Sequence, residues 1–283
     1  MNHSTLISAQ QLHEFDSREV LIVDCRFELS NVARGARDYA TGHIPGAVYA
    51  DLNSDLSDLS KTGVGRHPLP DAGQFEKVLS AWNWKPETFV VAYDDAGGAL
   101  AAARLWWMLR LVGSRSVAVL DGGIAAWTSA GFALDATIPE DSGLSVDASF
   151  DKSQIVMTDE LQRLMTSSRT LLLDARGAPR YRGDIEPIDR VAGHVPGARN
   201  RPFSDNLDAS GRFKPAVQLR SEFDAILGSH APLDVVHMCG SGVTACHNLL
   251  VMEHAGLHGS RIYAPSWSGW IADPQREIAV GEN

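Results

Sequence analysis

The residues best suited to covalent chemistry lie in one short segment, residues 235–246, with the sequence VVHMCGSGVTAC. The apolar run that ends at Met238 predicts a buried strand, and the pattern from Thr244 onward predicts a helix. Cys239 would then occupy the turn between them, at the carboxyl end of a parallel strand, where open α/β sheets bind ligands. The alternative, a buried cysteine that merely ends a core strand, would need no Gly-Ser-Gly turn.

Two glycines suit this turn to holding an anion. Gly240 and Gly242 can adopt backbone conformations that other residues avoid, so consecutive N–H groups can turn toward one centre. The helix expected to begin near Thr244 adds the positive end of its dipole. Because such surroundings stabilise thiolates, we predict that Cys239 is a nucleophile whose anion is held by backbone donors.

The other two cysteines are expected to be structural. Cys246 lies two helical turns farther on, within an apolar helix face, and Cys25 follows a buried strand without a glycine turn. Free cysteines are among the residues most often buried in protein cores. We therefore expect substitutions of Cys246 and Cys25 to affect stability rather than turnover.

Two rival chemistries are disfavoured at the same segment. A phosphatase loop needs an arginine six residues after its cysteine, and that place is Ala245 here. A zinc knuckle separates its cysteines by two to four residues, whereas six separate Cys239 from Cys246. We expect no metal from the nearby histidines and cysteines, which are His237, Cys239, Cys246, His247, His254 and His258.

The chain contains two copies of one unit. Gly42–Ala47, GHIPGA, returns as Gly193–Ala198, GHVPGA, about 150 residues later. Three further segments recur in the same order, which indicates tandem globular domains rather than a solenoid. These pairs are 21–26 with 171–176, 89–94 with 234–239, and 120–127 with 263–270. In each GHxPGA turn the histidine, His43 or His194, is expected to be a structural hydrogen bonder.

Short apolar runs alternate with helical patterns in both halves, which predicts an α/β fold with a mostly parallel sheet flanked by helices in each. A polar stretch over 134–152 contains Pro, Gly and Ser and indicates a linker. We therefore place the domains at 1–138 and 152–283. The expected strands are 20–24, 88–93, 117–120, 171–174, 235–238 and 262–263, and the clearest helices are 99–111 and 244–255.

The overall composition fits an enzyme or an interaction protein. The 283 residues include 25 Lys and Arg against 35 Asp and Glu, so the net charge of −10 disfavours nucleic acid as a partner. No apolar stretch reaches membrane-spanning length, and the first residues lack the pattern of a signal peptide. Three cysteines do not make a disulfide framework, so we expect a reducing compartment, the cytoplasm.

The duplicated unit, the two GH(I/V)PGA motifs and a cysteine loop in the second copy alone resemble the tandem rhodanese-type sulfurtransferases. The loop Cys239–Ala245, CGSGVTA, resembles that of the members acting on 3-mercaptopyruvate. Members that act on thiosulfate typically carry cationic residues directly after the cysteine. The resemblance implies two rhodanese-like domains and a single active site, in which Gly240, Gly242, Val243 and Thr244 contact the substrate.

Arginines are expected to bind the substrate carboxylate, because the guanidinium fork matches a carboxylate. The segment 180–190, RYRGDIEPIDR, resembles the family stretch that supplies two such arginines. The resemblance assigns this role to Arg180, and to Arg190 if one residue is inserted. Arg182 is expected at the surface.

The resemblance also implies a proton relay. In some family members an acid, a histidine and the loop serine form it, and His67 and Ser241 match two of these. Asn53 stands at the acid position and cannot carry a negative charge. His67 remains a candidate proton donor or orienting group.

The first copy has Asp94 where the second has Cys239. A carboxylate cannot accept sulfane sulfur, so the first domain is expected to be catalytically inactive.

The function predicted from these residues is transfer of sulfur from 3-mercaptopyruvate through a Cys239 persulfide to cyanide, a thiol or a thioredoxin-like protein. Pyruvate is released, and neither a metal nor an organic cofactor is required. Such covalent catalysis in two half-reactions gives ping-pong kinetics. Two alternatives stay open: a thiosulfate:cyanide sulfurtransferase on the same scaffold, and a non-enzymatic persulfide carrier or regulatory module.

Overall fold

The computed structural model describes residues 5–15, 19–139, 143 and 146–282, and the chain divides into two compact units. Most of each unit comes from one half of the sequence. Two short segments are exceptions, because residues 59–68 fold with the second unit and residues 209–213 with the first. The first unit comprises Met1–Asp58, Leu69–Asp151 and Ala209–Phe213, and the second comprises Leu59–Pro68, Lys152–Asp208 and Lys214–Asn283.

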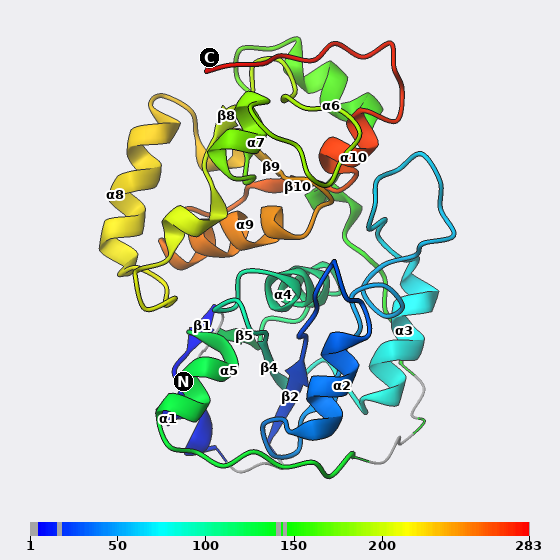
Figure 1. The fold of residues 1–283 in the computed structure, drawn as a ribbon, viewed down its shortest axis with the longest axis vertical. Coiled ribbons are helices and arrows are strands. Elements are labelled where there is room, and N and C mark those ends of the chain that lie inside the picture. Colours follow the sequence, from blue (N-terminus) through cyan, green and yellow to red (C-terminus); the bar gives the residue numbers. More distant parts are fainter. Residues whose placement is uncertain (1–4, 16–18, 140–142, 144–145, 283) are drawn as a thin grey trace. The chain divides into compact units, whose positions relative to one another are not determined.

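The first unit is built on a five-stranded parallel sheet with the strand order β1-β5-β4-β2-β3 (Figure 1). Its central strands are short and apolar, as expected for strands covered on both faces. The strands are β1 (Leu6–Ile7), β2 (Val20–Asp24), β3 (Val48–Tyr49), β4 (Phe89–Tyr93) and β5 (Val117–Leu120).

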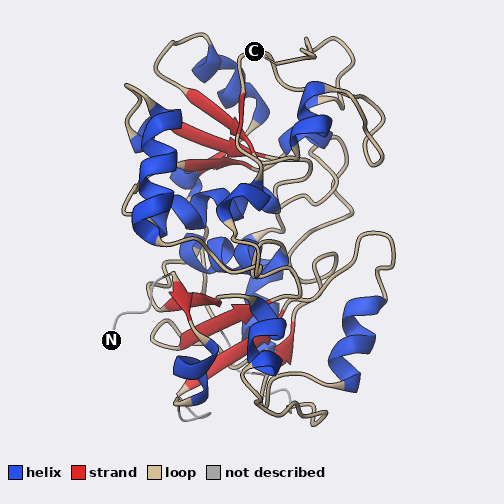
Figure 2. Cartoon of the chain, turned by 60° about the vertical axis from the view of Figure 1, so that its left-hand side comes forward, coloured by secondary structure: helices blue, strands red, loops and turns tan. Residues whose placement is uncertain are grey.

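Helices flank this sheet (Figure 2). Every residue of the helix after β4 is buried except Arg110, which is partly exposed, and Arg104 and Arg110 are its only charged residues. The helices are α1 (Ala9–His13), α2 (Arg34–Thr41), α3 (Ala72–Ala81), α4 (Ala101–Leu111) and α5 (Gly123–Ser129).

The second unit repeats this architecture. Its parallel sheet has the order β6-β10-β9-β7-β8, which matches the first sheet strand for strand. The strands are β6 (Ile155–Val156), β7 (Leu171–Asp174), β8 (Arg199–Asn200), β9 (Val235–Met238) and β10 (Arg261–Tyr263). The α-helices are α6 (Thr158–Met165), α7 (Ala178–Arg182), α8 (Ala216–Leu227), α9 (Thr244–His254) and α10 (Ser266–Trp270). Three short 3₁₀ helices are η1 (Lys152–Gln154), η2 (Phe203–Asn206) and η3 (Pro232–Asp234).

These two sheets confirm the predicted fold class. Four predicted strands, 20–24, 117–120, 171–174 and 235–238, have the bounds found in the structure. The predicted helices over 99–111 and 244–255 begin or end within two residues of α4 and α9. The two-residue strands β1, β3, β6 and β8 were not predicted, because two residues carry no readable periodicity.

The histidines of the GHxPGA turns are tied to backbone groups. His43 Nδ1 lies 2.8 Å from the carbonyl oxygen of Tyr39, and His194 Nδ1 lies 2.8 Å from that of Tyr181. Each imidazole also stacks on the ring of the tyrosine whose carbonyl it contacts, with ring centroids 4.1 Å apart for His43 and 3.8 Å apart for His194. Both histidines therefore hydrogen-bond to the backbone at equivalent positions of the two units.

An aspartate and an arginine recur at the end of the second strand of each sheet. Arg26 Nη2 lies 2.6 Å from Asp24 Oδ2 and also donates to the Gly42 carbonyl. Asp174 and Arg176 form the same pair at the same distance in the second unit. Each arginine thus links the end of a core strand to its GHxPGA turn.

The polar stretch predicted as a linker contacts the first unit where it is described. Asp135 forms an antiparallel bridge with His43, and the Ala148 N–H donates to Glu76 Oε1 at 2.9 Å. Residues 140–142, 144 and 145 of this stretch lie outside the described residues. Within the described part of the chain, no helix has the length and apolar character needed to cross a membrane.

Candidate active site

Cys239 lies where the sequence places it, directly after β9 and before α9. Cys239 is 2% exposed, and the turn that follows, Gly240–Val243, is buried as well. The cysteine therefore sits at the carboxyl end of a central parallel strand, with a helix N-terminus five residues on. This is the part of an open α/β sheet that binds ligands.

The sulfur receives a backbone hydrogen bond from its own turn. The Gly242 N–H lies 3.1 Å from Cys239 Sγ, and Gly242 reaches this place with a φ of 77°, a conformation that favours glycine. The Cys246 thiol lies 3.3 Å from the Gly242 carbonyl oxygen, on the other side of the same residue. Gly242 thus connects the two sulfurs, and Cys246 acts as a packed donor to the turn.

Gly240 is needed for a different reason from Gly242. It does not have a positive φ, so the backbone alone would accept a side chain. A Cβ at this position would instead lie 3.2 Å from Arg66 Nη2 and 3.6 Å from Arg180 Nη1 and Nη2. The absence of a side chain lets two guanidinium groups approach the backbone next to Cys239.

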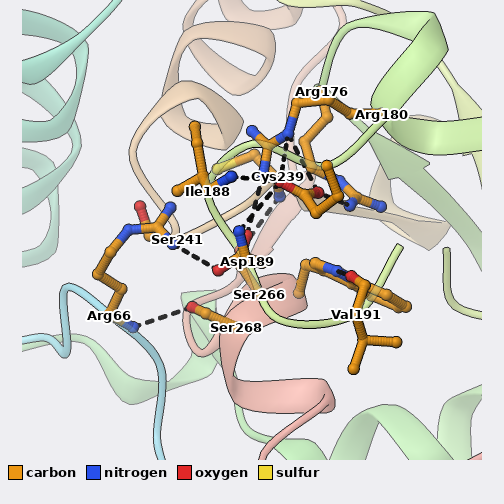
Figure 3. Close-up of polar contacts among 12 residues, drawn as sticks. Arg66, Arg176, Arg180, Ile188, Asp189, Val191, Cys239, Ser241, Ser266 and Ser268 are labelled. Atoms are coloured by element: carbon orange, nitrogen blue, oxygen red, sulfur yellow. Dashed lines mark hydrogen bonds and ion pairs between the residues drawn. The ribbon is translucent and has the colours of Figure 1, made fainter. Parts of the chain in front are cut away.

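The Cys239 turn is fixed to α10 by three hydrogen bonds. The Cys239 N–H donates to Ser266 Oγ at 3.1 Å (Figure 3). The Trp267 N–H donates to the Cys239 carbonyl, and the Ser268 N–H to the Gly240 carbonyl, each at 2.9 Å. Ser266 adopts a φ of 52°, which is uncommon outside glycine. The place of these serines and Trp267 in the site could not be inferred from the local sequence.

His67 and Ser241 are brought together. His67 Nδ1 lies 2.9 Å from Ser241 Oγ, and both residues are buried, at 5% and 7% exposure. His67 belongs to the segment 59–68 that folds with the second unit. Asn53 belongs to the first unit, where its N–H donates to Asp51 Oδ1. The catalytic roles of His67 and Ser241 stay predictions.

Arg66, the neighbour of His67, adds a cation that was not among the predicted site residues. Its backbone N–H donates to Ser268 Oγ at 2.9 Å, which ties it to the residue that also holds Gly240. Its guanidinium and that of Arg180, from α7, both lie against Gly240. The side chains are 25% and 18% exposed, so the two charges face the surface beside the cysteine turn.

Two carboxylates pair with these arginines. Asp189 bridges them, with Oδ1 2.5 Å from Arg66 Nη1 and Oδ2 3.0 Å from Arg180 Nη2 (Figure 3). Glu186 lies 2.7 Å from Arg180 Nη2. Burial alone would raise the pKa of Glu186, but hydrogen bonds from Arg180 and from backbone N–H groups hold it below its ordinary value.

Arg176 is a third cation of the site. It is held by Asp174 and lies over the Trp267 ring, 4.7 Å from the centroid. Burial disfavours its charge, but Asp174, Glu186 and, to a smaller extent, Cys239 raise the pKa of the guanidinium above its ordinary value. Arg176 is therefore a permanent buried positive charge that interacts with the cysteine.

The remaining predicted site residues are Arg190, Val243 and Thr244. Arg190 donates to the carbonyl of Ile271. Val243 is buried at the start of α9, and Thr244 is the first residue of that helix and partly exposed. Arg182 pairs with acidic residues nearer the surface, as expected.

The equivalent turn in the first unit holds a carboxylate. Asp94 follows β4 and is fully buried. Burial raises the pKa of its carboxyl, while four backbone N–H groups oppose this by donating to it. The donors, at 2.7–3.3 Å, are Ala96, Gly98, Leu100 and Ala102. The first unit therefore keeps the anion-holding turn but fills it with its own side chain.

Among the described residues, no group of three or more His, Cys, Asp or Glu side chains is placed to bind a metal ion. Burial lowers the pKa of His237 to about 3, and its Nε2 lies 3.1 Å from Ser260 Oγ. His237 is therefore a neutral core residue.

A parallel-stranded α/β unit with a cysteine at the strand–helix turn, present twice with one cysteine replaced, defines a tandem protein of the rhodanese class. A family model described as "Rhodanese-like domain" matches residues 8–130 and again 157–273. The chain therefore belongs to the rhodanese family.

Three known proteins illustrate the similarity. A Pseudomonas aeruginosa protein named "Probable 3-mercaptopyruvate sulfurtransferase" is 47% identical over 287 residues, covering 100% of both chains. The human 3-mercaptopyruvate sulfurtransferase is 32% identical, covering 98% of this chain and 95% of its own. The crystal structure of SseA from Escherichia coli, a 3-mercaptopyruvate sulfotransferase, has a TM-score of 0.79 at 28% identity, covering 94% of this chain and 99% of its own.

Proposed function

We propose that this protein is a sulfurtransferase that moves sulfur from 3-mercaptopyruvate through a Cys239 persulfide to an acceptor and releases pyruvate. The observation that carries the proposal is the Gly242 N–H on the sulfur of a cysteine placed directly after β9. The names of similar full-length relatives support the choice of donor.

The first half-reaction starts with attack of the Cys239 thiolate on the thiol sulfur of 3-mercaptopyruvate. The new S–S bond forms as the carbon–sulfur bond breaks, and its electron pair stays on carbon as the enolate of pyruvate. The enolate takes up one proton, and Cys239 carries the persulfide. Backbone donors such as the Gly242 N–H stabilise the sulfur anions without reorganising.

Ser241 and His67 are proposed to deliver that proton. Ser241 belongs to the turn that carries Cys239, and its Oγ lies 2.9 Å from His67 Nδ1. A hydroxyl that is hydrogen-bonded to an imidazole can pass a proton to a carbanion within reach. Arg180, beside Gly240, is the proposed ligand of the donor carboxylate. Gly240, Val243 and Thr244 complete the proposed wall around the substrate.

In the second half-reaction an acceptor thiolate or cyanide attacks the outer sulfur and returns Cys239 as a thiolate. We propose a small thiol or a thioredoxin-like protein as the physiological acceptor, and the cytoplasm as the compartment, because three buried cysteines that form no disulfide suit a reducing environment. Persulfide loss from loaded enzyme, followed with and without reduced thioredoxin, tests the acceptor. An unchanged rate of persulfide loss would exclude thioredoxin as the acceptor.

The first domain, which we place at residues 1–138, is proposed to be catalytically inactive, with the catalytic domain at 152–283. Asp94 supports this, since a carboxylate cannot form a persulfide and already accepts four backbone N–H groups.

The deciding experiment compares pyruvate release from 3-mercaptopyruvate with thiocyanate release from thiosulfate and cyanide. The proposal expects the higher kcat/KM with 3-mercaptopyruvate, and one added sulfur by intact mass that Cys239→Ser loses. Preference for thiosulfate would favour the thiosulfate:cyanide enzyme. Loading without turnover on either donor would favour a carrier.

A further inference from the structure

The carboxylate of Asp189 is held as a bound ligand would be. Its two oxygens contact two different guanidinium groups, those of Arg66 and Arg180 (Figure 3). The aspartate side chain is only 5% exposed, whereas the arginines are 25% and 18% exposed. Proteins commonly recognise a carboxylate by hydrogen bonds from guanidinium groups to its oxygens.

The two guanidinium groups that hold this carboxylate lie against the turn that carries Cys239. Both guanidinium groups come within 3.2–3.6 Å of the Cβ position of Gly240, the residue that follows Cys239. A substrate carboxylate bound by the same two guanidinium groups would therefore be held against the turn that carries the nucleophile. The first residue of the pair, Arg66, is itself fixed to this turn through Ser268.

The turn that carries Asp189 allows exchange. Glu186 accepts the backbone N–H groups of Ile188 and Asp189 and also pairs with Arg180. Arg180 therefore keeps one partner when the Asp189 carboxylate leaves. Ile188, at the tip of the turn, is 44% exposed, so its side chain is only loosely packed.

We propose that Arg66 and Arg180 form the carboxylate subsite for the sulfur donor and that Asp189 occupies this subsite as a built-in competitor until the donor displaces it. This inference rests on the proposed function. It makes Asp189 a specificity-determining residue, because an anion must replace both of its hydrogen bonds to enter. A tethered group competes at an effective concentration on the order of millimolar, so weakly held anions are excluded.

The test uses alkylation of Cys239, which needs no turnover. Iodoacetate carries a carboxylate, and iodoacetamide is its neutral counterpart, so the ratio of their rate constants reports access to the subsite. Asp189→Asn should raise this ratio about tenfold, equivalent to about 1.4 kcal/mol. It should likewise lower, about tenfold, the pyruvate concentration that half-protects Cys239 from iodoacetamide. Peptide mass analysis assigns the alkylated cysteine.

A matched control removes the same charge from the same segment. Asp184 pairs with Arg182 and is 52% exposed, so Asp184→Asn should leave the ratio within about twofold of wild type. Adding Arg66→Ala to Asp189→Asn should abolish the gain. Far-UV circular dichroism and melting temperature establish that each variant is folded.

A folded Asp189→Asn variant whose ratio is unchanged or lower overturns the inference, since the aspartate would then only hold the arginines in place. An equal rise in Asp184→Asn also overturns it, because general charge would explain the result. Failure of the proposed function is a separate outcome: wild-type enzyme would release no pyruvate from 3-mercaptopyruvate while the alkylation ratios behaved as expected.

Discussion

A positive charge placed on the Cys239 turn should redirect the protein toward thiosulfate. The proposed change is Gly240→Arg, at the residue against which Arg66 and Arg180 lie. Gly240 lacks a positive φ, so the substitution adds a side chain and a charge without forcing a strained backbone. The existing guanidinium groups already face the carboxylates of Asp189 and Glu186, so the new charge would not be offset.

The size of the effect follows from Coulomb's law. Thiosulfate carries two negative charges, whereas 3-mercaptopyruvate carries one carboxylate, so the new cation favours thiosulfate by one extra charge pair. At about 6 Å, and an effective dielectric constant of about 40 for this partly exposed site, one pair is worth about 1.4 kcal/mol. We therefore expect the ratio of kcat/KM for thiosulfate to that for 3-mercaptopyruvate to rise about 5- to 30-fold.

The assay measures kcat/KM for both donors in wild type, Gly240→Arg and the uncharged control Gly240→Gln, at low and high salt. The control carries the steric cost of a long side chain, whose Cβ must displace Arg66 Nη2 from 3.2 Å. The shift should appear in the arginine variant and shrink with salt. A second positive charge, in Gly240→Arg/Ser241→Lys, should extend it. A folded arginine variant with the same donor ratio as the glutamine control would refute the reasoning.

Three further predictions test the site and its counterpart. Cys239→Ser should abolish turnover and sulfur loading, whereas Cys246→Ser should mainly lower the melting temperature; an active Cys239→Ser variant would exclude the mechanism. Arg180→Ala should reduce kcat/KM for 3-mercaptopyruvate about 10- to 150-fold, equivalent to about 1.5–3 kcal/mol, the worth of a charged hydrogen bond, and Arg190→Ala by less, because its guanidinium donates to a backbone carbonyl. Asp94→Asn should lower stability to urea by at least about 2 kcal/mol, since an amide group would face buried N–H donors that need an acceptor; a variant as stable as wild type would contradict this account.

The central strands could be predicted because strands buried on both faces have continuous apolar sequences. Val20–Asp24 and Val235–Met238 are flanked by strands on both sides, and their bounds agree with prediction. The edge strands Leu6–Ile7 and Ile155–Val156 have only two residues each, so neither alternation nor composition distinguishes them from loop. Sequence pattern thus predicts the centre of each sheet better than its edges.

The candidate site divides in the same way. The Cys239 turn is local, so its residues could be read directly from the glycine spacing. Arg66 could not, because its partners Asp189 and Ser268 lie 123 and 202 residues away in sequence. Ser266 likewise meets Cys239 across 27 residues, with no motif to indicate it. Long-range tertiary contacts, rather than local propensity, place these groups.

The duplication supplies a comparison within one molecule. In both units a parallel strand ends at a turn whose backbone N–H groups face an anionic position. In the first unit the Asp94 carboxylate fills that position and satisfies four N–H groups, so the turn is closed. In the second unit the Gly242 N–H faces the sulfur of Cys239, the guanidinium groups of Arg66 and Arg180 lie against Gly240, and the buried Arg176 interacts with the cysteine. The same local fold is therefore structural where a carboxyl group of the chain fills the turn, and suited to catalysis where the turn holds a cysteine sulfur that can carry a persulfide.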